Sequence, residues 1–174
     1  RRYNIVKDEF DLIKKEVEQA VKENDLVLIG AGSSAGRKDH TVHVLQEMGE
    51  VLVHGVAIRP GKPAILAIVQ GKPVVGVPGY PVSAYFILDL FVKPLLYRWQ
   101  KQALPERDKC RAIFTRRVVS SLKEEEFLRV KLGKVGKKII ATPLSRGAGV
   151  SMSLVRADGL ARIPLNCEGL EAGQ

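Results

Sequence analysis

The chain opens with apolar residues that recur every three to four positions among charged ones. Over residues 5–23 this spacing predicts an amphipathic helix, with Asp8 or Asp11 placed to cap its start. A short continuous apolar run at residues 26–29 then predicts a strand that is buried on both faces. The helix is therefore expected to cover a sheet to which this strand belongs.

The next stretch alternates helical and strand patterns. Helical spacing over residues 39–48 predicts a second helix that stops at Gly49, and the β-branched run at residues 51–58 predicts a strand. Two further strands, residues 64–69 and 73–77, flank a turn that contains a glycine, which is typical of a hairpin. These elements indicate an α/β domain.

A change of pattern near residue 104 divides the chain. Before it, residues 81–100 read as one long helix, which Pro94 is expected to kink. After it, short β-rich runs separated by glycines predict a small all-β barrel or sandwich. These runs are residues 111–120, 126–132, 137–141 and 150–156. We therefore predict an α/β domain at residues 1–104 and a β domain at residues 105–174.

Composition and length narrow the class of protein. The 174 residues, of which 45% are hydrophobic, can bury a core of one or two domains. No apolar run approaches the roughly 20 residues that span a bilayer, and the charged start does not resemble a signal peptide. Cys110 and Cys167 have neither metal-site spacing nor the density of a disulfide scaffold, so both are expected to be plain thiols. A cytoplasmic protein with no membrane partner is the expectation.

The net charge of +9 raises the question of a nucleic-acid partner. Most of the excess lies in residues 105–174, which carry 14 Lys and Arg against 8 Asp and Glu. That part has only Phe114 and Phe127 as aromatic residues, which is poor material for stacking bases. We therefore expect a solvated basic face and no nucleic-acid partner. His40 and His43 could share a metal, but the spacing offers no third ligand cluster.

Candidate chemistry begins with the glycine and serine loop that follows residues 26–29. Gly32 and Gly36 allow close backbone approach, and Ser33 and Ser34 supply hydroxyl groups. Because a helix is predicted to follow, the loop can present free N–H groups to a phosphate or another oxyanion. A tight turn without a ligand is the alternative, and the loop alone does not decide between them.

Two further loops carry polar groups on rigid backbone. Arg59 and Lys62 lie in the sequence RPGKP, where two prolines hold two cations on a short turn that suits an acidic ligand. The sequence PGYPVSA places Tyr80 beside the start of the long helix and Ser83 within its first turn. A decorated hairpin turn is the alternative for the first of these loops.

Taken together, the three loops resemble the molybdopterin molybdenumtransferase family, called MoeA in bacteria and the gephyrin E domain in animals. GAGSSAGRKD stands where the family has GGxSxGxxD, VAIRPGKP where it has Lys or Arg before PGKP, and PGYPVSA where it has PGNPVSA. The closing SLVRADGLARIP is similar to the family's last β domain. The resemblance implies a three-layer MogA/MoaB-like molybdopterin-binding domain, truncated at its N-terminus, followed by a small β-barrel.

The resemblance also implies a reaction and a set of roles. Molybdate is inserted into adenylylated molybdopterin with release of AMP and with Mg²⁺, by a protein that is a homodimer at full length. Asp39, for metal or phosphate, and Arg59, for molybdate or phosphate, are the implied catalytic residues. The implied substrate-binding residues are Gly32, Ser33, Ser34, Gly36, Lys62, Pro78, Gly79, Tyr80 and Ser83.

Several positions depart from the family pattern. Tyr80 replaces the usual Asn, Gly55 stands where some members have a second Lys, and Ala31 replaces a glycine. The chain also begins partway through the family's α/β domain, so we expect a fragment of a larger protein that is inactive alone. A binding or regulatory module without turnover is the main alternative, and a polyanion-binding domain is a second one.

Overall fold

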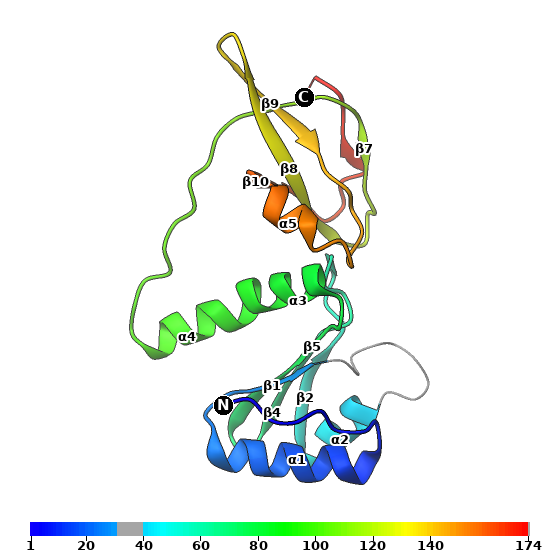
Figure 1. Ribbon diagram of the computed structural model, residues 1–174, viewed down its shortest axis with the longest axis vertical. Helices are drawn as coiled ribbons and strands as arrows, with labels where there is room; N and C mark the ends of the chain where they lie inside the picture. Colours follow the sequence, from blue (N-terminus) through cyan, green and yellow to red (C-terminus); the bar gives the residue numbers. More distant parts are fainter. Residues whose placement is uncertain (31–39, 174) are drawn as a thin grey trace. The chain divides into compact units, whose positions relative to one another are not determined.

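The computed structural model describes residues 1–30 and 40–173 (Figure 1). The chain divides into two compact units. The first unit comprises residues 1–56 and 61–79, and the second comprises residues 57–60 and 80–174. Each unit is described by itself below.

The first unit is a mixed sheet with helices packed on it. Its strands follow the order β1-β5-β4-β2, with β1 parallel to β5 and the other neighbours antiparallel. The elements are α1 (Phe10–Glu23), β1 (Val27–Gly30), α2 (His40–Met48), β2 (Gly49–His54), β4 (Ile65–Val69) and β5 (Lys72–Val77). This arrangement confirms the helices and strands predicted for residues 5–77, except that α1 starts later than expected and the strand predicted at residues 51–58 ends at His54, before Gly55 with its positive φ of 89°.

The core of the first unit lies between the two helices and one face of the sheet. Val21 of α1 and Leu45 of α2 are fully buried against Ile65 and Val69 of β4 and Val74 of β5. These strand residues share one face because side chains alternate along a strand. Burying aliphatic side chains of this size stabilises a fold by about 1.5–3 kcal/mol each.

Two details of the sequence prediction are wrong in this unit. β1 is not buried on both faces, because the face that carries Val27 packs on the core whereas Leu28, on the opposite face, is 46% exposed. Neither predicted aspartate caps α1, whose N-cap is Glu9 with no side-chain capping bond. The helix starts at Phe10, which leaves Asp8 before the cap and Asp11 inside the first turn, where its charge favours the helix dipole.

Glycines are required at two turns of this sheet for different reasons. The β4–β5 hairpin turns through Gln70 and Gly71, both with positive φ (50° and 76°), as a two-residue turn of this twist demands. Gly49 follows α2 directly and begins β2. A Cβ on Gly49 would lie 2.1 Å from the carbonyl oxygen of Ile68, so the close approach of β2 to β4 excludes a side chain there.

The second unit combines a helical segment with a curled, mostly antiparallel sheet. Its strands follow the order β10-β8-β9-β6, β3 adds to β8 in parallel, and β11 pairs with β7. The elements are β3 (Ile58–Arg59), α3 (Pro81–Ile87), η1 (Leu88–Val92), α4 (Lys93–Trp99), β6 (Ile113–Phe114), β7 (Val118–Val119), β8 (Glu125–Val135), β9 (Lys138–Pro143), α5 (Met152–Arg156), β10 (Gly159–Ile163) and β11 (Gly169–Leu170).

The predicted long helix is present, and Pro94 interrupts its hydrogen bonding. A π-helical turn, η1, precedes the proline, and the N–H of Lys93 reaches back to the carbonyl of Leu88. Because proline has no N–H to donate, the helix adjusts its bonding just before that position. Phe86 of α3 packs on Phe127 of β8, with ring centroids 5.2 Å apart.

One predicted strand is wrong. Residues 150–156 were expected in a β-rich run, but they contain the short helix α5. Ser153 is buried in this helix, donates a hydrogen bond to the carbonyl of Val150 at 2.6 Å, and accepts one from Nε of Arg129 at 3.1 Å. These contacts favour a local turn over an extended strand, despite the β-branched residues.

The remaining runs of the second unit form strands as predicted. Leu128, Val130 and Ile163 bury a core between β8 and β10. Cys110, which is exposed, and Cys167, which is half-buried, are free cysteines. The predicted fold class, an α/β domain followed by a small β domain, is thus confirmed. Within residues 1–30 and 40–173, no helix has both the length and the apolar character needed to cross a lipid bilayer.

The pKa of Asp158, which precedes β10, tests the contacts that this residue makes with β8. Its carboxylate accepts a hydrogen bond from Nζ of Lys131 at 2.7 Å and another from the N–H of Leu132 at 2.8 Å, and these lower the pKa of Asp158. Its contribution to stability is therefore present above the ordinary aspartate pKa and is lost as pH falls through the lowered value. In an NMR titration, Asp158 should titrate below ordinary aspartates, and Lys131→Met should raise its midpoint. A wild-type midpoint at or above the ordinary range would contradict these contacts.

Candidate substrate-binding site

The strand and the helix predicted on either side of the glycine and serine segment are both present. β1 ends at Gly30 and α2 begins at His40. The predicted site residues of this loop lie outside the described residues. They are Gly32, Ser33, Ser34, Gly36 and Asp39.

Arg59 lies on β3, the two-residue strand that pairs with β8. The N–H of Glu125 donates to the carbonyl of Ala57 at 2.8 Å, and Nε of Arg59 lies 3.2 Å from a carboxylate oxygen of Glu124. The Arg59 side chain is 49% exposed, whereas that of Glu124 is 10% exposed. A nearly buried carboxylate thus orients an arginine that still reaches solvent.

The other predicted residues divide between the two units. Lys62, Pro78 and Gly79 belong to the first unit, while Arg59, Tyr80 and Ser83 belong to the second. In the first unit, the carbonyl of Lys62 accepts a hydrogen bond from the N–H of Val56 at 2.8 Å, and the Lys62 side chain is exposed. Pro78 is buried and Gly79 is exposed.

A loop of the β domain meets the start of α3. The N–H of Val82, in the first turn of α3, donates to the carbonyl of Ala148 at 3.1 Å. Tyr80 is 65% exposed, and a Cβ built on Gly149 would lie 3.5 Å from its ring. Ser83 is buried. The second unit therefore contains Arg59 together with the Tyr80 and Ser83 segment, each attached to the β domain.

Sequence reasoning missed the glutamates that organise this unit. Glu124, Glu125 and Glu126, here called the glutamate triplet, each form an ion pair with an arginine from a different part of the chain. The partners are Arg59, Arg162 and Arg146 respectively. Three successive carboxylates at the start of a strand, within the more basic part of the chain, were the available signal.

Arg129 is a buried cation at the centre of the same unit. It is 2% exposed, and one terminal nitrogen donates to the carbonyl of Ser145 at 2.7 Å. Burial lowers the pKa of the Arg129 guanidinium, and the nearby Glu126 carboxylate partly offsets this.

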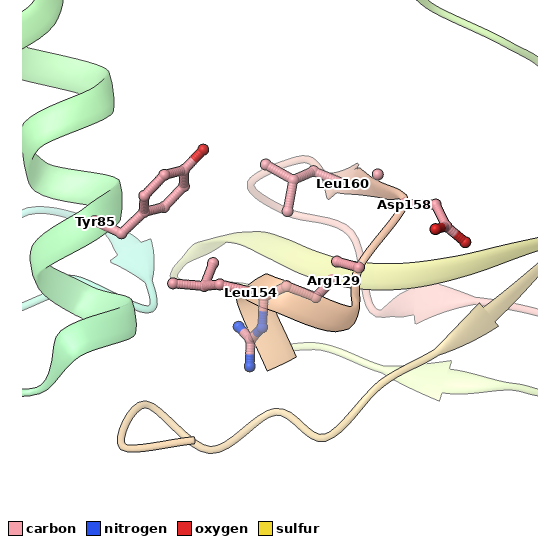
Figure 2. Close-up of a pocket in the computed structure, with 7 residues that line it drawn as sticks. Tyr85, Arg129, Leu154, Asp158 and Leu160 are labelled. Carbon is pink, nitrogen blue, oxygen red and sulfur yellow. The ribbon is translucent and has the colours of Figure 1, made fainter. Parts of the chain in front are cut away.

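Arg129 also lines a cavity of about 210 Å³ inside the second unit (Figure 2). Tyr85 reaches into it from α3 toward Leu154 and Leu160, while the carboxylate of Asp158 points away from Arg129. None of the described site residues predicted from the sequence lines this cavity.

Comparison with known proteins identifies the family. A family described as "Probable molybdopterin binding domain" matches residues 1–98, and one described as "MoeA C-terminal region (domain IV)" matches residues 111–174. The chain belongs to the MoeA family. It corresponds to the C-terminal part of that family, whose members act in molybdenum cofactor biosynthesis.

Individual relatives agree with this assignment. The chain is 39% identical over 172 residues to a "Putative molybdopterin biosynthesis protein" of Methanocaldococcus jannaschii, and 28% identical over 171 residues to the molybdopterin molybdenumtransferase of Bacillus subtilis. These matches cover 99% and 97% of the chain but 40% of each relative. The chain thus spans about two-fifths of the length of these MoeA relatives.

A solved structure supports the fold. The molybdopterin biosynthesis MoeA protein of Pyrococcus horikoshii superposes with a TM-score of 0.78 at 37% sequence identity, covering 98% of this chain and 41% of that one. The likeness extends over both the α/β part and the β domain.

Proposed function

We propose that the protein inserts molybdate into adenylylated molybdopterin and releases AMP. Membership of the MoeA family and the three loop motifs in their family order support this proposal. The observation that carries it is the setting of Arg59, a half-exposed cation held by the nearly buried Glu124.

Arg59 suits the ligands of this reaction. Molybdate and the phosphates of the adenylylated pterin are oxyanions, and a guanidinium binds such groups through several N–H donors in a fixed plane. Glu124 forms an ion pair with Nε of Arg59, so the terminal nitrogens can face a substrate without a large loss of side-chain freedom. Arg59 would stabilise the charge that develops as the phosphoanhydride breaks.

The protein's contribution would be positioning and electrostatics rather than a nucleophile. In the overall change, the two dithiolene sulfurs replace two oxygens of molybdate, one of which leaves as water, while the other balances the oxygen that is gained when the phosphoanhydride is cleaved to AMP. Holding both reactants in place can remove several kcal/mol of a barrier, and oriented charges stabilise the transition state further. Gly32, Ser33, Ser34, Gly36, Lys62, Pro78, Gly79, Tyr80 and Ser83 are proposed as substrate-binding residues.

Magnesium is the cofactor implied by the resemblance. Among residues 1–30 and 40–173, no group of three or more His, Cys, Asp or Glu side chains could hold a metal ion. Asp39, the proposed metal residue, lies outside that range. The described residues therefore supply no donor set that fits Mg²⁺, and no step of the proposal is routed through it.

A non-catalytic pterin- or molybdate-binding module is the second candidate. Tyr80 favours it, because this exposed aromatic ring stands where the family has an asparagine amide. The test is an assay of the complete protein that carries this sequence, with adenylylated molybdopterin and molybdate. Molybdate-dependent AMP release supports the transferase, and tight binding without release supports the module.

We also propose that the complete protein is a cytoplasmic homodimer.

Asp39 provides a prediction for the glycine loop. If its carboxylate handles the phosphate or the metal, Asp39→Asn should lower the rate of AMP release by about 100-fold or more, because the amide keeps the shape and loses the charge. The melting temperature of the variant serves as the control for folding. Unchanged turnover in Asp39→Asn would remove this residue from the proposal.

A further inference from the structure

The glutamate triplet presents its carboxylates on two sides of one strand. Side chains alternate along a strand, so Glu125 and Glu126 of β8 point to opposite sides, while Glu124 lies just before the strand. Arg59 is the ladder neighbour of Glu126 and is held by Glu124, whereas Arg162 pairs with Glu125. Glu125 and Glu126 therefore hold their arginines, Arg162 and Arg146, on opposite faces of β8.

The pair formed by Glu126 is the most buried of the three. The Glu126 side chain is 3% exposed, while its partner Arg146 is 38% exposed. Arg146 donates from Nε at 2.7 Å and from a terminal nitrogen at 2.5 Å to the two oxygens of the carboxylate. Ser120 donates a further hydrogen bond to the same carboxylate at 2.8 Å. A two-point contact of this kind fixes direction as well as distance.

Arg146 belongs to the loop at residues 144–151, which is attached to β8 at one end and to α3 at the other. The N–H of Leu144 donates to the carbonyl of Arg129 at 2.9 Å, and the carbonyl of Ala148 accepts from the N–H of Val82 at 3.1 Å. The loop therefore bonds to the first turn of α3 through Ala148, and its Gly149 lies next to the ring of Tyr80.

We propose that Glu126 is a positioning residue for the substrate-binding segment at the start of α3. Glu126 holds the loop at residues 144–151 through Arg146, and this loop in turn holds the first turn of α3. Tyr80 and Ser83 are thereby fixed relative to Arg59, which is the ladder neighbour of Glu126. The consequence for substrate rests on the proposed function. The mechanical coupling does not.

The coupling can be measured at one amide. In Glu126→Gln, hydrogen exchange of the Val82 N–H, followed by NMR in the 174-residue chain, should be at least about tenfold faster than in the wild type. The matched control is Glu125→Gln, which breaks the neighbouring pair on the opposite side of the strand and should leave Val82 unchanged. The amide of Val130, in the middle of β8, reports whether each variant is folded.

The result that overturns the proposal is equally specific. Unchanged exchange at Val82 in a folded Glu126→Gln variant, or equal acceleration in Glu125→Gln, shows that the ion pair does not hold the loop. If Glu126→Gln fails to fold, Arg146→Lys decides instead, because lysine keeps the charge beside Glu126 but loses the planar two-point contact. Its Val82 exchange should also be faster.

The functional consequence has its own readout. In the complete protein, Glu126→Gln should raise KM for adenylylated molybdopterin about tenfold with a smaller change in kcat, and Glu125→Gln should change neither. Faster Val82 exchange with an unchanged KM would overturn the role in substrate positioning. A wild-type protein that neither binds nor turns over this substrate would defeat the proposed function, while Val82 exchange would still decide the coupling.

Discussion

Arg59→Ala is expected to lower kcat/KM for molybdate-dependent AMP release by about 100-fold or more. The variant removes a cation that Glu124 holds in place and that is half exposed to an incoming anion. Losing one oriented group that stabilises developing negative charge typically costs this much or more in rate. The measurement is steady-state kinetics of the complete protein with adenylylated molybdopterin.

Arg162→Ala is the matched control for this prediction. Arg162 also pairs with a member of the glutamate triplet, Glu125, and its side chain is 70% exposed. Arg162 differs from Arg59 because it lies on β10, which pairs with β8 on the side opposite to β3. Its loss should change the rate by less than about twofold, as expected for an exposed ion pair away from a site. Equal losses in the two variants would mean that overall charge, not the position of Arg59, matters.

Gly49→Ala is expected to destabilise the first unit by about 3 kcal/mol or more. Its new methyl group would lie 2.1 Å from the carbonyl oxygen of Ile68 and 3.0 Å from Cα of Val69, both backbone atoms. β2 must then move away from β4, which disrupts the ladder that begins at the Gly49–Val69 pair. Overpacking against rigid atoms reaches the upper part of the range seen for single substitutions. Urea unfolding followed by circular dichroism measures the change.

Gly133→Ala is the control for the glycine prediction. Gly133 also lies in a strand, β8, but apart from its chain neighbours no atom of the described residues lies within 4 Å of a Cβ placed there. Alanine at this position should leave stability within about 0.5 kcal/mol of the wild type or improve it slightly, since glycine is a poor strand residue. If Gly49→Ala is as well tolerated as Gly133→Ala, the close approach of β2 and β4 is not as described.

Much of the fold could be predicted because its signals are local. The apolar spacing of α1, the continuous runs of β4 and β5, and the turn at Gln70 and Gly71 each lie within about a dozen residues. The change of pattern after residue 104 likewise anticipates the matches to residues 1–98 and 111–174. The boundary itself stays a prediction, because the compact units divide the chain differently.

The features that the sequence did not reveal depend on distant partners. α5 forms where β-branched residues favour a strand, because Ser153 is bonded to Arg129, 24 residues earlier. Leu28 is exposed because it lies on the face of β1 opposite to the core residue Val27, and no local pattern specifies which face packs on the helices. The glutamate triplet looks like a solvated charge run until its three arginines, from three separate segments, are brought to it.

The candidate site shows the same division. The motifs identified Arg59 and Lys62 from their prolines, but nothing nearby in the sequence predicts that Arg59 is held by a carboxylate 65 residues later. Ser83 was expected as a hydroxyl at a helix start, and it is buried there. The neighbouring N–H of Val82 already donates to the carbonyl of Ala148. The β domain therefore determines the setting of residues that lie in the α/β part of the sequence.

We propose above all that the complete protein couples molybdate insertion to cleavage of the adenylylated pterin. It is tested most directly by titrating molybdate into the complete protein loaded with adenylylated molybdopterin and measuring AMP. We predict one AMP released for each molybdenum inserted, with no release when molybdate is omitted. Stable binding of the adenylylated pterin with no AMP formed at any molybdate concentration would contradict the account.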